Sequence, residues 1–351
     1  MKKTFMIFFA LCFLSAPVMA ETPVFSIAVS EYPSWSGTFL AAHDIGLING
    51  EEGEMGPIEE RWNVDIVIRD TDYDTCITLF VGGTVDAACL TNIDSLAPSV
   101  TRQATAILPT STSNGADALL VDPSIGTVQD LKELRVRGLA ASVSEYTFDK
   151  GLEMMGENPD DYTFENLDPV QVGVMLQNGH IKAGVTWNPV VMEALKSNTS
   201  LKRLFDSSLI QGHIIDMVTV SRDSLQRQGG HNFAMAILDT YFTICRLMES
   251  QETRDQTLTA MGQRFSDLGL MEMRTIVRET SFYSTPEKAL ELFTGENLPE
   301  VMTDHILPWT TEKELTEADN MPSIAFEDCP DTDLCFDPQY IKAYIEHMQQ
   351  Q

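Results

Sequence analysis

The stretch Gly82-Gly83-Thr84-Val85-Asp86-Ala87-Ala88-Cys89-Leu90-Thr91-Asn92-Ile93-Asp94 constrains the fold of this chain more than any other. The preceding residues, Asp74–Val81, are predicted to form a helix that the glycine pair ends. A short apolar strand follows the glycines and runs into polar and acidic residues. A helix, a glycine turn, a buried strand and a polar loop make one half of a β-α-β unit. In open α/β sheets, the loops at the carboxyl ends of such strands are where ligands bind.

The first twenty residues have the pattern of a secretion signal. Lys2 and Lys3 precede an apolar run over 5–14, and Val18-Met19-Ala20 resembles a cleavage site before Glu21. The run is too short to span a bilayer as a helix, and no later segment has about 18 consecutive apolar residues. We therefore expect residues 1–20 to be a signal peptide and the mature chain to be exported without inserting into a membrane.

The net charge and the cysteine content limit the possible class of protein further. The 351 residues carry a formal net charge of -29, which repels nucleic acid and anionic lipid, so no nucleic-acid partner is expected. Cys329 and Cys335 lie close together in an acidic tail, and a local disulfide between them is expected in an oxidising compartment. Cys76, Cys89 and Cys245 fall on apolar patterns typical of buried thiols, and no spacing predicts a metal site.

Strand and helix patterns alternate through the first 220 residues. Strands are predicted at 25–29, 64–68, 85–90, 104–108, 119–121, 135–139 and 183–187, with helices between several of them. From Asn232 the apolar period becomes 3.6, and further helices are predicted near 253–265, 270–280, 286–293 and 338–349. This order predicts an α/β protein with a parallel or mixed sheet in each of two lobes and a helical C-terminal region.

Two segments are predicted to connect the lobes. Ser111–Asp117 is a polar run that can carry the chain across, and the apolar segment Ile214–Val220 can bring it back. The first lobe is accordingly expected to comprise 21–115 and 216–351, and the second lobe 116–215. The acidic tail, Glu314–Asp337, is expected on the surface.

Six short motifs, in order along residues 25–220, carry a resemblance to a known family. They are Trp35 with Gly37, Gly83-Thr84-Val85-Asp86, Thr91-Asn92-Ile93-Asp94, Ser113-Asn114-Gly115-Ala116-Asp117, Ser142-Val143-Ser144-Glu145-Tyr146 and Thr186-Trp187-Asn188-Pro189. The chain resembles the periplasmic binding proteins of ABC transporters in the taurine, nitrate and thiamine-precursor group. It looks most like the branch associated with urea carboxylase and guanidine carboxylase gene clusters, from which it departs at Ala116 and Glu145.

The resemblance implies a two-lobed, type II-like periplasmic binding protein that works with a permease and an ATPase. We expect it to be a monomer without a cofactor. The predicted pocket loops combine aromatic rings, carboxylates and amides but almost no lysine or arginine. The expected ligand-binding residues are Tyr32, Trp35, Asp70, Tyr73, Asn92, Asp94, Asn114, Asp117, Ser144, Glu145, Tyr146, Trp187, Asn188 and Asp216. Carboxylates beside aromatic faces suit a cation, and a planar guanidinium matches both.

Other interpretations of these residues and of the chain stay open at this point. Asp94 can cap a helix, Asp117 and Glu145 can be solvated hinge residues, and Trp187 can belong to the core. A thiamine precursor or a taurine-type compound is an alternative ligand, and an exported sensor is an alternative role. No serine-hydrolase, phosphate-loop or zinc-protease motif is present, and the six histidines are scattered, so an enzyme is not expected.

Overall fold

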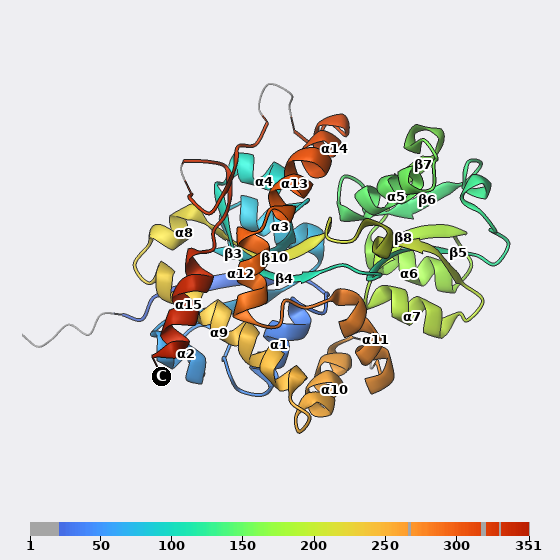
Figure 1. Cartoon of the computed structure of the whole chain (residues 1–351). Helices are drawn as coiled ribbons and strands as arrows, with labels where there is room; N and C mark the ends of the chain where they lie inside the picture. Colours follow the sequence, from blue (N-terminus) through green and yellow to red (C-terminus); the bar gives the residue numbers. More distant parts are fainter. Residues whose placement is uncertain (1–20, 266–267, 317–320, 330, 351) are drawn as a thin grey trace, which may run out of the picture.

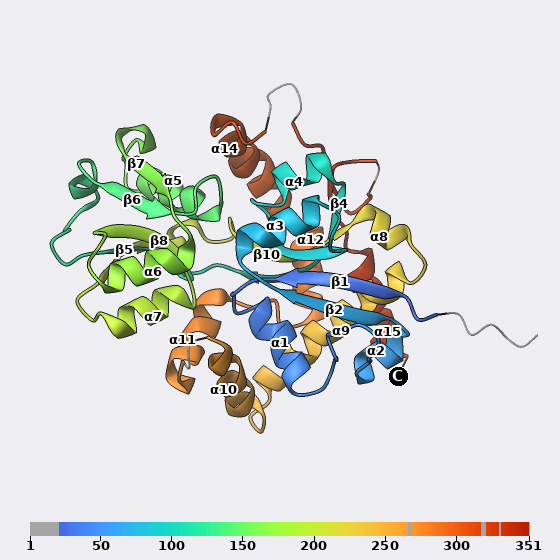
Figure 2. The same cartoon turned by 180° about the vertical axis from the view of Figure 1, so that it is seen from behind.

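The computed structural model describes residues 21–265, 268–316, 321–329 and 331–350 and contains two separate sheets (Figures 1 and 2). The predicted signal peptide, 1–20, lies outside the described residues. The larger sheet has the strand order β11-β12-β4-β10-β3-β1-β2. Its strands are β1 (Val24–Val29), β2 (Asp65–Asp70), β3 (Ala87–Thr91), β4 (Ala104–Thr112), β10 (Ile215–Ser221), β11 (Ile324–Phe326) and β12 (Leu334–Phe336).

The glycine-bounded unit predicted around Gly82 is confirmed. Helix α3 (Tyr73–Val81) is capped by Asp72, whose side chain accepts a hydrogen bond from the backbone N–H of Thr75. Gly83 adopts φ +71°, a left-handed conformation that glycine takes without steric cost. Strand β3 follows, fully buried, and pairs in parallel with β1. Asp86 is structural, because its carboxylate accepts hydrogen bonds from the backbone and hydroxyl of Ser26.

The smaller sheet has the order β7-β6-β8-β5-β9. Its strands are β5 (Asp117–Val121), β6 (Arg135–Gly138), β7 (Thr163–Asn166), β8 (Ala183–Trp187) and β9 (Lys202–Asp206), and the helices beside it are α5 (Val143–Met154), α6 (Pro169–Gln177) and α7 (Val190–Ser197). Two apolar clusters, around Leu119 and around Leu120, pack on opposite faces of β5 because successive side chains of a strand point in opposite directions. The sheet therefore has its own core.

Both sheets combine parallel and antiparallel pairs, so the predicted α/β architecture with a mixed sheet in each lobe is confirmed. The chain passes from β4 to β5 and returns from β9 to β10, which lies antiparallel between β4 and β3. We keep the predicted lobe limits, 115/116 and 215/216, as a proposal that this strand pairing supports.

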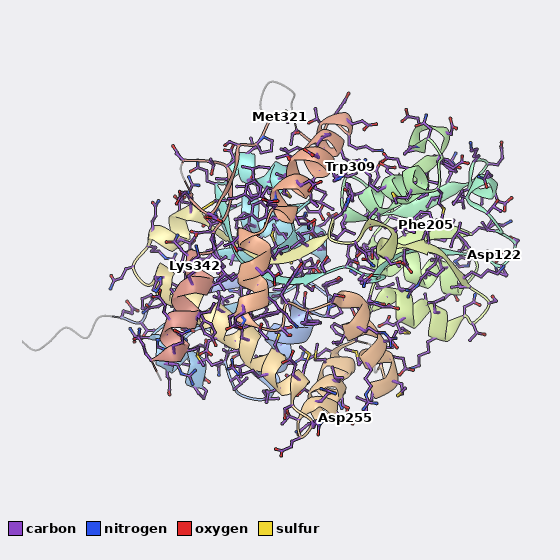
Figure 3. The ribbon with its side chains drawn as sticks, viewed as in Figure 1. Asp122, Phe205, Asp255, Trp309, Met321 and Lys342 are labelled. Carbon is purple, nitrogen blue, oxygen red and sulfur yellow. A yellow bond between two sulfur atoms is a disulfide. The ribbon has the colours of Figure 1, made fainter. Side chains whose placement is uncertain are left out.

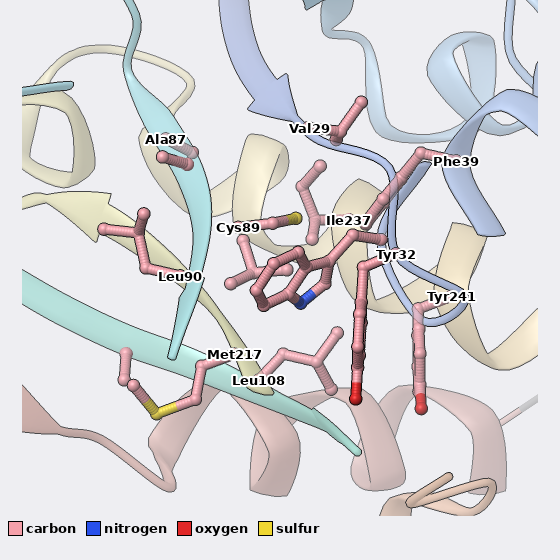
Figure 4. Packing of buried hydrophobic residues seen from close by; sticks show 14 of the residues in the cluster. Val29, Tyr32, Phe39, Ala87, Cys89, Leu90, Leu108, Met217, Ile237 and Tyr241 are labelled. Carbon is pink, nitrogen blue, oxygen red and sulfur yellow. The ribbon is translucent and has the colours of Figure 1, made fainter. Parts of the chain in front are cut away.

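Helices cover the larger sheet on both faces. The apolar stripe predicted from Asn232 lies on α9 (Gly230–Glu249), whose Phe233, Ile237 and Tyr241 are fully buried. Ile237 and Tyr241 belong to the same buried cluster as Leu108 and Met217 of the sheet (Figure 4). The remaining helices are α1 (Ser36–Asp44), α2 (Pro57–Trp62), α4 (Leu96–Thr101), α8 (Arg222–Gln226), α10 (Arg254–Arg264), α11 (Leu270–Thr280), α12 (Pro286–Thr294), α13 (Asn297–Glu300), α14 (Leu307–Glu312) and α15 (Gln339–Gln349).

The prediction that the whole acidic tail lies on the surface is wrong. Leu334, Cys335 and Phe336 are fully buried, because β12 pairs in parallel with β4 and extends the larger sheet. Cys329 and Cys335 form a disulfide with Cα atoms 5.5 Å apart. Cys76, Cys89 and Cys245 are buried free thiols, as predicted. Within the described ranges, no helix has both the length and the apolar character needed to cross a membrane.

Candidate functional site

A small space lies where the two lobes meet, and we call it the inner cavity. It is lined by Tyr32, Trp35, Tyr73, Thr91, Asp117, Val143, Trp187, Ile214 and Asp216. Its volume is about 10 Å³, which is close to the space that one water molecule needs. The lobes are therefore closed on a space that the protein's own side chains almost fill.

Aromatic rings from three places in the chain form the walls of the inner cavity. Tyr32 and Trp35 come from the loop after β1, and their ring centroids are 4.8 Å apart. Tyr73, the first residue of α3, stacks on Trp35 at 5.4 Å. Trp187, the last residue of β8, meets Tyr73 edge-on at 5.6 Å. Stacked and edge-on ring contacts thus hold the aromatic side chains of the cavity wall together.

Two carboxyl groups complete the cavity wall, and neither has a basic partner among the described residues. Asp117 begins β5 directly opposite Trp187 in the strand register. Burial, with a further contribution from the charge of Asp94, raises the pKa of Asp117 to about 7. Asp216, on β10, accepts a hydrogen bond from the hydroxyl of Ser111, yet burial holds its pKa well above the usual range. A positive charge between these carboxyls would offset both shifts, because it favours the ionised form.

Asp94 lies behind the aromatic wall instead of lining the cavity. Its Oδ2 accepts hydrogen bonds from the hydroxyls of Tyr73, at 2.8 Å, and Thr91, at 3.0 Å. Its Oδ1 accepts one from the backbone N–H of Val143, at 3.1 Å. Burial raises the pKa of Asp94 to about 6 despite these donors. The alternative prediction, that Asp94 caps the helix that follows it, is wrong, because Ser95 occupies the N-cap position of α4.

Several buried polar atoms near the cavity have no hydrogen-bond partner within the described part of the chain. They include Nε1 of Trp35, Oγ of Ser144 and Oδ1 of Asn188. A buried polar group without a partner costs free energy, so such atoms commonly mark the place of a water molecule or a ligand. Trp35 lines the cavity itself and is 2% exposed. Its indole N–H is therefore a donor available to a bound molecule.

Of the fourteen predicted ligand-binding residues, six line the inner cavity: Tyr32, Trp35, Tyr73, Asp117, Trp187 and Asp216. The amide of Asn92 is used within the protein, donating to the carbonyl of His213 and accepting from the N–H of Ile215. Asn114 is exposed and accepts a hydrogen bond from the amide of Gln211. Asn188 donates to Glu279 across the lobe boundary.

Glu145 and Tyr146 lie on α5 and make contacts away from the cavity. Glu145 forms an ion pair with Lys313, and the hydroxyl of Tyr146 is 2.7 Å from Nδ1 of His213. Tyr146 also packs edge-on against Trp309 of the first lobe. Trp309, labelled in Figure 3, lies on the side of that lobe that faces α5. Both residues therefore join the lobes in this structure.

The remaining predicted residue, Asp70, lines a larger pocket of about 390 Å³ at the mouth of the interlobe space. We call this pocket the outer chamber. Sequence reasoning missed Glu31 and Asp168, which also line it, and Thr91, Val143 and Ile214 in the inner cavity. Glu31 could have been found, because it follows β1 as directly as Tyr32 does. Within the described ranges, no group of three or more His, Cys, Asp or Glu side chains is placed to hold a metal ion.

The architecture defined by these two lobes is that of the periplasmic binding proteins, and comparison with solved structures shows this fold. The alkanesulfonate-binding protein SsuA from Xanthomonas axonopodis pv. citri, bound to MOPS, matches with a TM-score of 0.66 and 16% identity over 84% of this chain and 95% of its own. The ligand-binding component of an ABC-type import system from Staphylococcus aureus, with zinc bound, matches with a TM-score of 0.63 and 12% identity over 91% and 98%.

The periplasmic nitrate-binding protein NrtA from Synechocystis PCC 6803 matches with a TM-score of 0.56 and 11% identity over 93% of this chain and 98% of its own. At these identities the likeness concerns the fold and leaves the ligand open. No protein-family model matches the sequence, and the search of curated proteins finds no relative.

Proposed function

We propose that this protein is the periplasmic substrate-binding component of an ABC importer and captures a small nitrogen-rich cation between its lobes. Guanidinium or a simple derivative is the first candidate, and the permease and ATPase subunits of the importer are the proposed partners. One observation carries the choice of ligand: Asp117 and Asp216 face an aromatic-walled cavity without any lysine, arginine or histidine among its lining residues. Binding without catalysis agrees with the absence of catalytic motifs from the sequence.

The charge of the cavity argues against an anion. Sulfonate and nitrate carry negative charge, and a pocket for them needs fixed cations or free backbone N–H groups. Here the cavity lining holds no fixed cation, and each of the two carboxyls would repel such a ligand whenever it is ionised. A guanidinium offers N–H donors to both carboxyls and a flat face to Tyr73, Trp35 or Trp187. Its positive charge would also favour the ionised form of Asp117 and Asp216.

Entry and retention of a guanidinium both require the lobes to lie further apart than in this structure, because the inner cavity has only about 10 Å³ of free space. Two chain crossings, between β4 and β5 and between β9 and β10, connect the lobes. Such a connection permits hinge closure around a ligand. The proposed cycle is therefore opening, insertion of the cation between the rings, and closure onto the carboxyls.

Calorimetric titration of the purified protein against guanidinium, taurine, nitrate and an aminopyrimidine tests the proposal. Guanidinium should bind, and Asp117→Asn should weaken its binding by about 2–5 kcal/mol, because the variant leaves the cation without one of its buried partners. Asp160→Asn, which changes an exposed carboxylate on the second lobe, is the matched control and should bind like the unmodified protein. Tight binding of taurine or nitrate with no response to guanidinium would contradict the proposal.

The two alternative ligand classes are separated by the same titration. Binding of the aminopyrimidine alone would favour a thiamine precursor, and binding of taurine alone would favour the taurine-type ligand that the sulfonate-binding neighbour suggests. An exported sensor would bind the same ligand but would be encoded beside a histidine kinase. A neighbouring permease and ATPase would support transport.

A further inference from the structure

A chain of buried hydroxyl groups ends on the carboxyl of Asp216. The hydroxyl of Ser111 contacts this carboxyl on one side, and on the other it donates to Oγ of Ser34 at 2.8 Å. Oγ of Ser34 is in turn 3.0 Å from Oγ1 of Thr110. Ser34, Thr110 and Ser111 are fully buried, so the three hydroxyls depend on one another and on Asp216 for their hydrogen bonds.

The chain exists because strand β4 is irregular at this point. Ser111 lies directly opposite Asp216 in the pairing of β4 with β10, so the two side chains share one face of the sheet. The register then shifts between Asp216 and Met217, which leaves Thr110 as an extra residue on β4. Consecutive side chains of a regular strand point to opposite faces, whereas here both Thr110 and Ser111 reach Ser34.

The single hydrogen of the Ser111 hydroxyl cannot serve both of its neighbours. If Asp216 is ionised, the carboxylate accepts this hydrogen, and Ser111 has none left to donate to Ser34. If Asp216 carries a proton, the carboxyl donates to Ser111 and leaves the Ser111 hydrogen for Ser34. Ser34 can then donate to Thr110, so every contact in the chain has its hydrogen.

The surroundings of Asp216 also favour its protonated form. The titratable side chains that interact with it come from both lobes and from the helices packed on the larger sheet: Tyr32, Cys89, Asp94, Asp117, Tyr241 and Tyr283. All six are neutral or negative near neutral pH, so they do not stabilise a carboxylate by charge. Burial acts in the same direction and holds the pKa of Asp216 well above its usual range.

We infer that Ser34 and Ser111 are positioning residues that hold a proton on Asp216 in the empty protein. Ionisation of Asp216 releases that proton to solvent, turns the Ser111 hydroxyl toward the carboxylate and breaks its hydrogen bond to Ser34. Ser34 therefore opposes the ionised form of Asp216, and Ser111 supports it. The consequence for cation binding rests on the proposed function, whereas the protonation is a property of the protein without ligand.

Infrared difference spectroscopy of the ligand-free protein tests the protonation directly. A protonated carboxyl has a C=O stretching band that a carboxylate lacks, and the band that disappears in Asp216→Asn belongs to Asp216. We expect this band to be present at pH 7, where exposed carboxyls are ionised. Absence of an Asp216 band at pH 7 would overturn the inference.

Two serine variants should move the ionisation of Asp216 in opposite directions. Ser34→Ala removes the competing acceptor, so Ser111 is free to donate to the carboxylate, and the band should titrate about one pH unit lower. Ser111→Ala removes this donor, and the band should persist to a pH about one unit higher. These opposite shifts identify the band even if Asp216→Asn does not fold, because the hydrogen bonds of both serines lead to this carboxyl.

Ser99→Ala is the matched control for these variants. Ser99 is also fully buried, but its hydroxyl donates to the backbone carbonyl of Leu96 within α4. The control should leave the band unchanged, and Ser111→Thr, which keeps the hydroxyl, should titrate like the unmodified protein. Shifts of the same sign in Ser34→Ala and Ser111→Ala, or an equal shift in the control, would overturn the inference.

Calorimetric titration of the same variants with guanidinium measures the consequence for binding. At pH 7, Ser34→Ala should bind guanidinium up to about tenfold more tightly and Ser111→Ala up to about tenfold more weakly, because one pH unit corresponds to a factor of ten. Unchanged affinities beside opposite band shifts would overturn the role of the chain in binding. Absence of guanidinium binding by the unmodified protein would overturn the proposed function and leave the infrared test unaffected.

Discussion

The carboxylate of Asp94 crosses the boundary between the lobes, where its Oδ1 accepts a 3.1 Å hydrogen bond from the backbone N–H of Val143. Val143 is the first residue of α5, so the carboxylate lies at the positive end of that helix's dipole. The same side chain holds the hydroxyl of Tyr73 at 2.8 Å. The Asp94 carboxylate therefore both contacts the second lobe and holds the Tyr73 ring in the cavity wall.

Asp94→Asn should weaken cation binding about tenfold without lowering the melting temperature at pH 7. The variant removes a negative charge behind the cavity, but it also removes the cost of burying that charge. The loss should be smaller than that of Asp117→Asn, because Asp94 does not line the cavity. Titration calorimetry and thermal unfolding measure the two effects separately. A variant that unfolds earlier and binds normally would show that Asp94 is only structural.

Lys313 joins the lobes on the side of α5. Its Nζ is 3.0 Å from Glu145 and 2.8 Å from Asp149, and the indole N–H of Trp309 donates to the same Asp149 carboxylate at 2.8 Å. Lys313→Met leaves Asp149 buried without its cation, which costs about 1–3 kcal/mol in the closed form. The open form should therefore become more populated, and small-angle scattering should give a larger radius of gyration without ligand.

Lys132→Met is the control for this variant. Lys132 also bridges two carboxylates, Glu157 and Asp161, but all three belong to the second lobe. Its loss should leave the radius of gyration unchanged. An equal response of both variants would mean that Lys313 does not govern closure.

The disulfide between Cys329 and Cys335 should contribute little to stability. It closes a loop with a sequence separation of 6, and short loops restrict the unfolded chain only slightly. Reduction should therefore cost less than about 3 kcal/mol of unfolding free energy. Denaturant unfolding with and without reductant measures this cost, and Cys329→Ala tests it without disturbing the fully buried Cys335. A larger loss would show that the bridge holds β12 in the sheet.

Strands and site loops were predictable where the signal is local. The apolar runs of β1 and β2 predicted strands, and the rings that follow these two strands predicted part of the cavity wall, because parallel strands place their carboxyl ends together. Strand β9 was not predicted, because it begins with the charged residues Lys202 and Arg203 and lies at the edge of its sheet. Strand β12 was not predicted either, because it is only an apolar triplet within an acidic tail. The contacts of Glu145 and Tyr146 were not predictable, since the face of α5 turned toward the cavity depends on packing.

The buried carboxyls should make the empty protein less stable as the pH rises from about 4 to about 7. The pKa of Asp117 is raised from 3.8 to about 7 and that of Asp94 to about 6, so the folded state keeps protons that the unfolded state has released. The stabilisation that these two protonated carboxyls provide is complete below about pH 4. It is lost as the pH rises through their pKa values in the folded state, about 6 for Asp94 and about 7 for Asp117. Thermal unfolding of Asp117→Asn should show a flatter pH dependence over this range, and Asp160→Asn an unchanged one.

Binding of a cation should release protons near neutral pH. In the empty site, Asp117, with a pKa of about 7, is partly protonated, and a cation between Asp117 and Asp216 favours the ionised carboxylates. By linkage, the affinity should fall as the pH decreases from about 8 to about 6, and protons should leave on binding. Calorimetric titrations at pH 7 in buffers with different ionisation enthalpies measure this release directly. Asp117→Asn should reduce it. Identical binding enthalpies in all buffers would show that the ligand does not lie between these carboxyls.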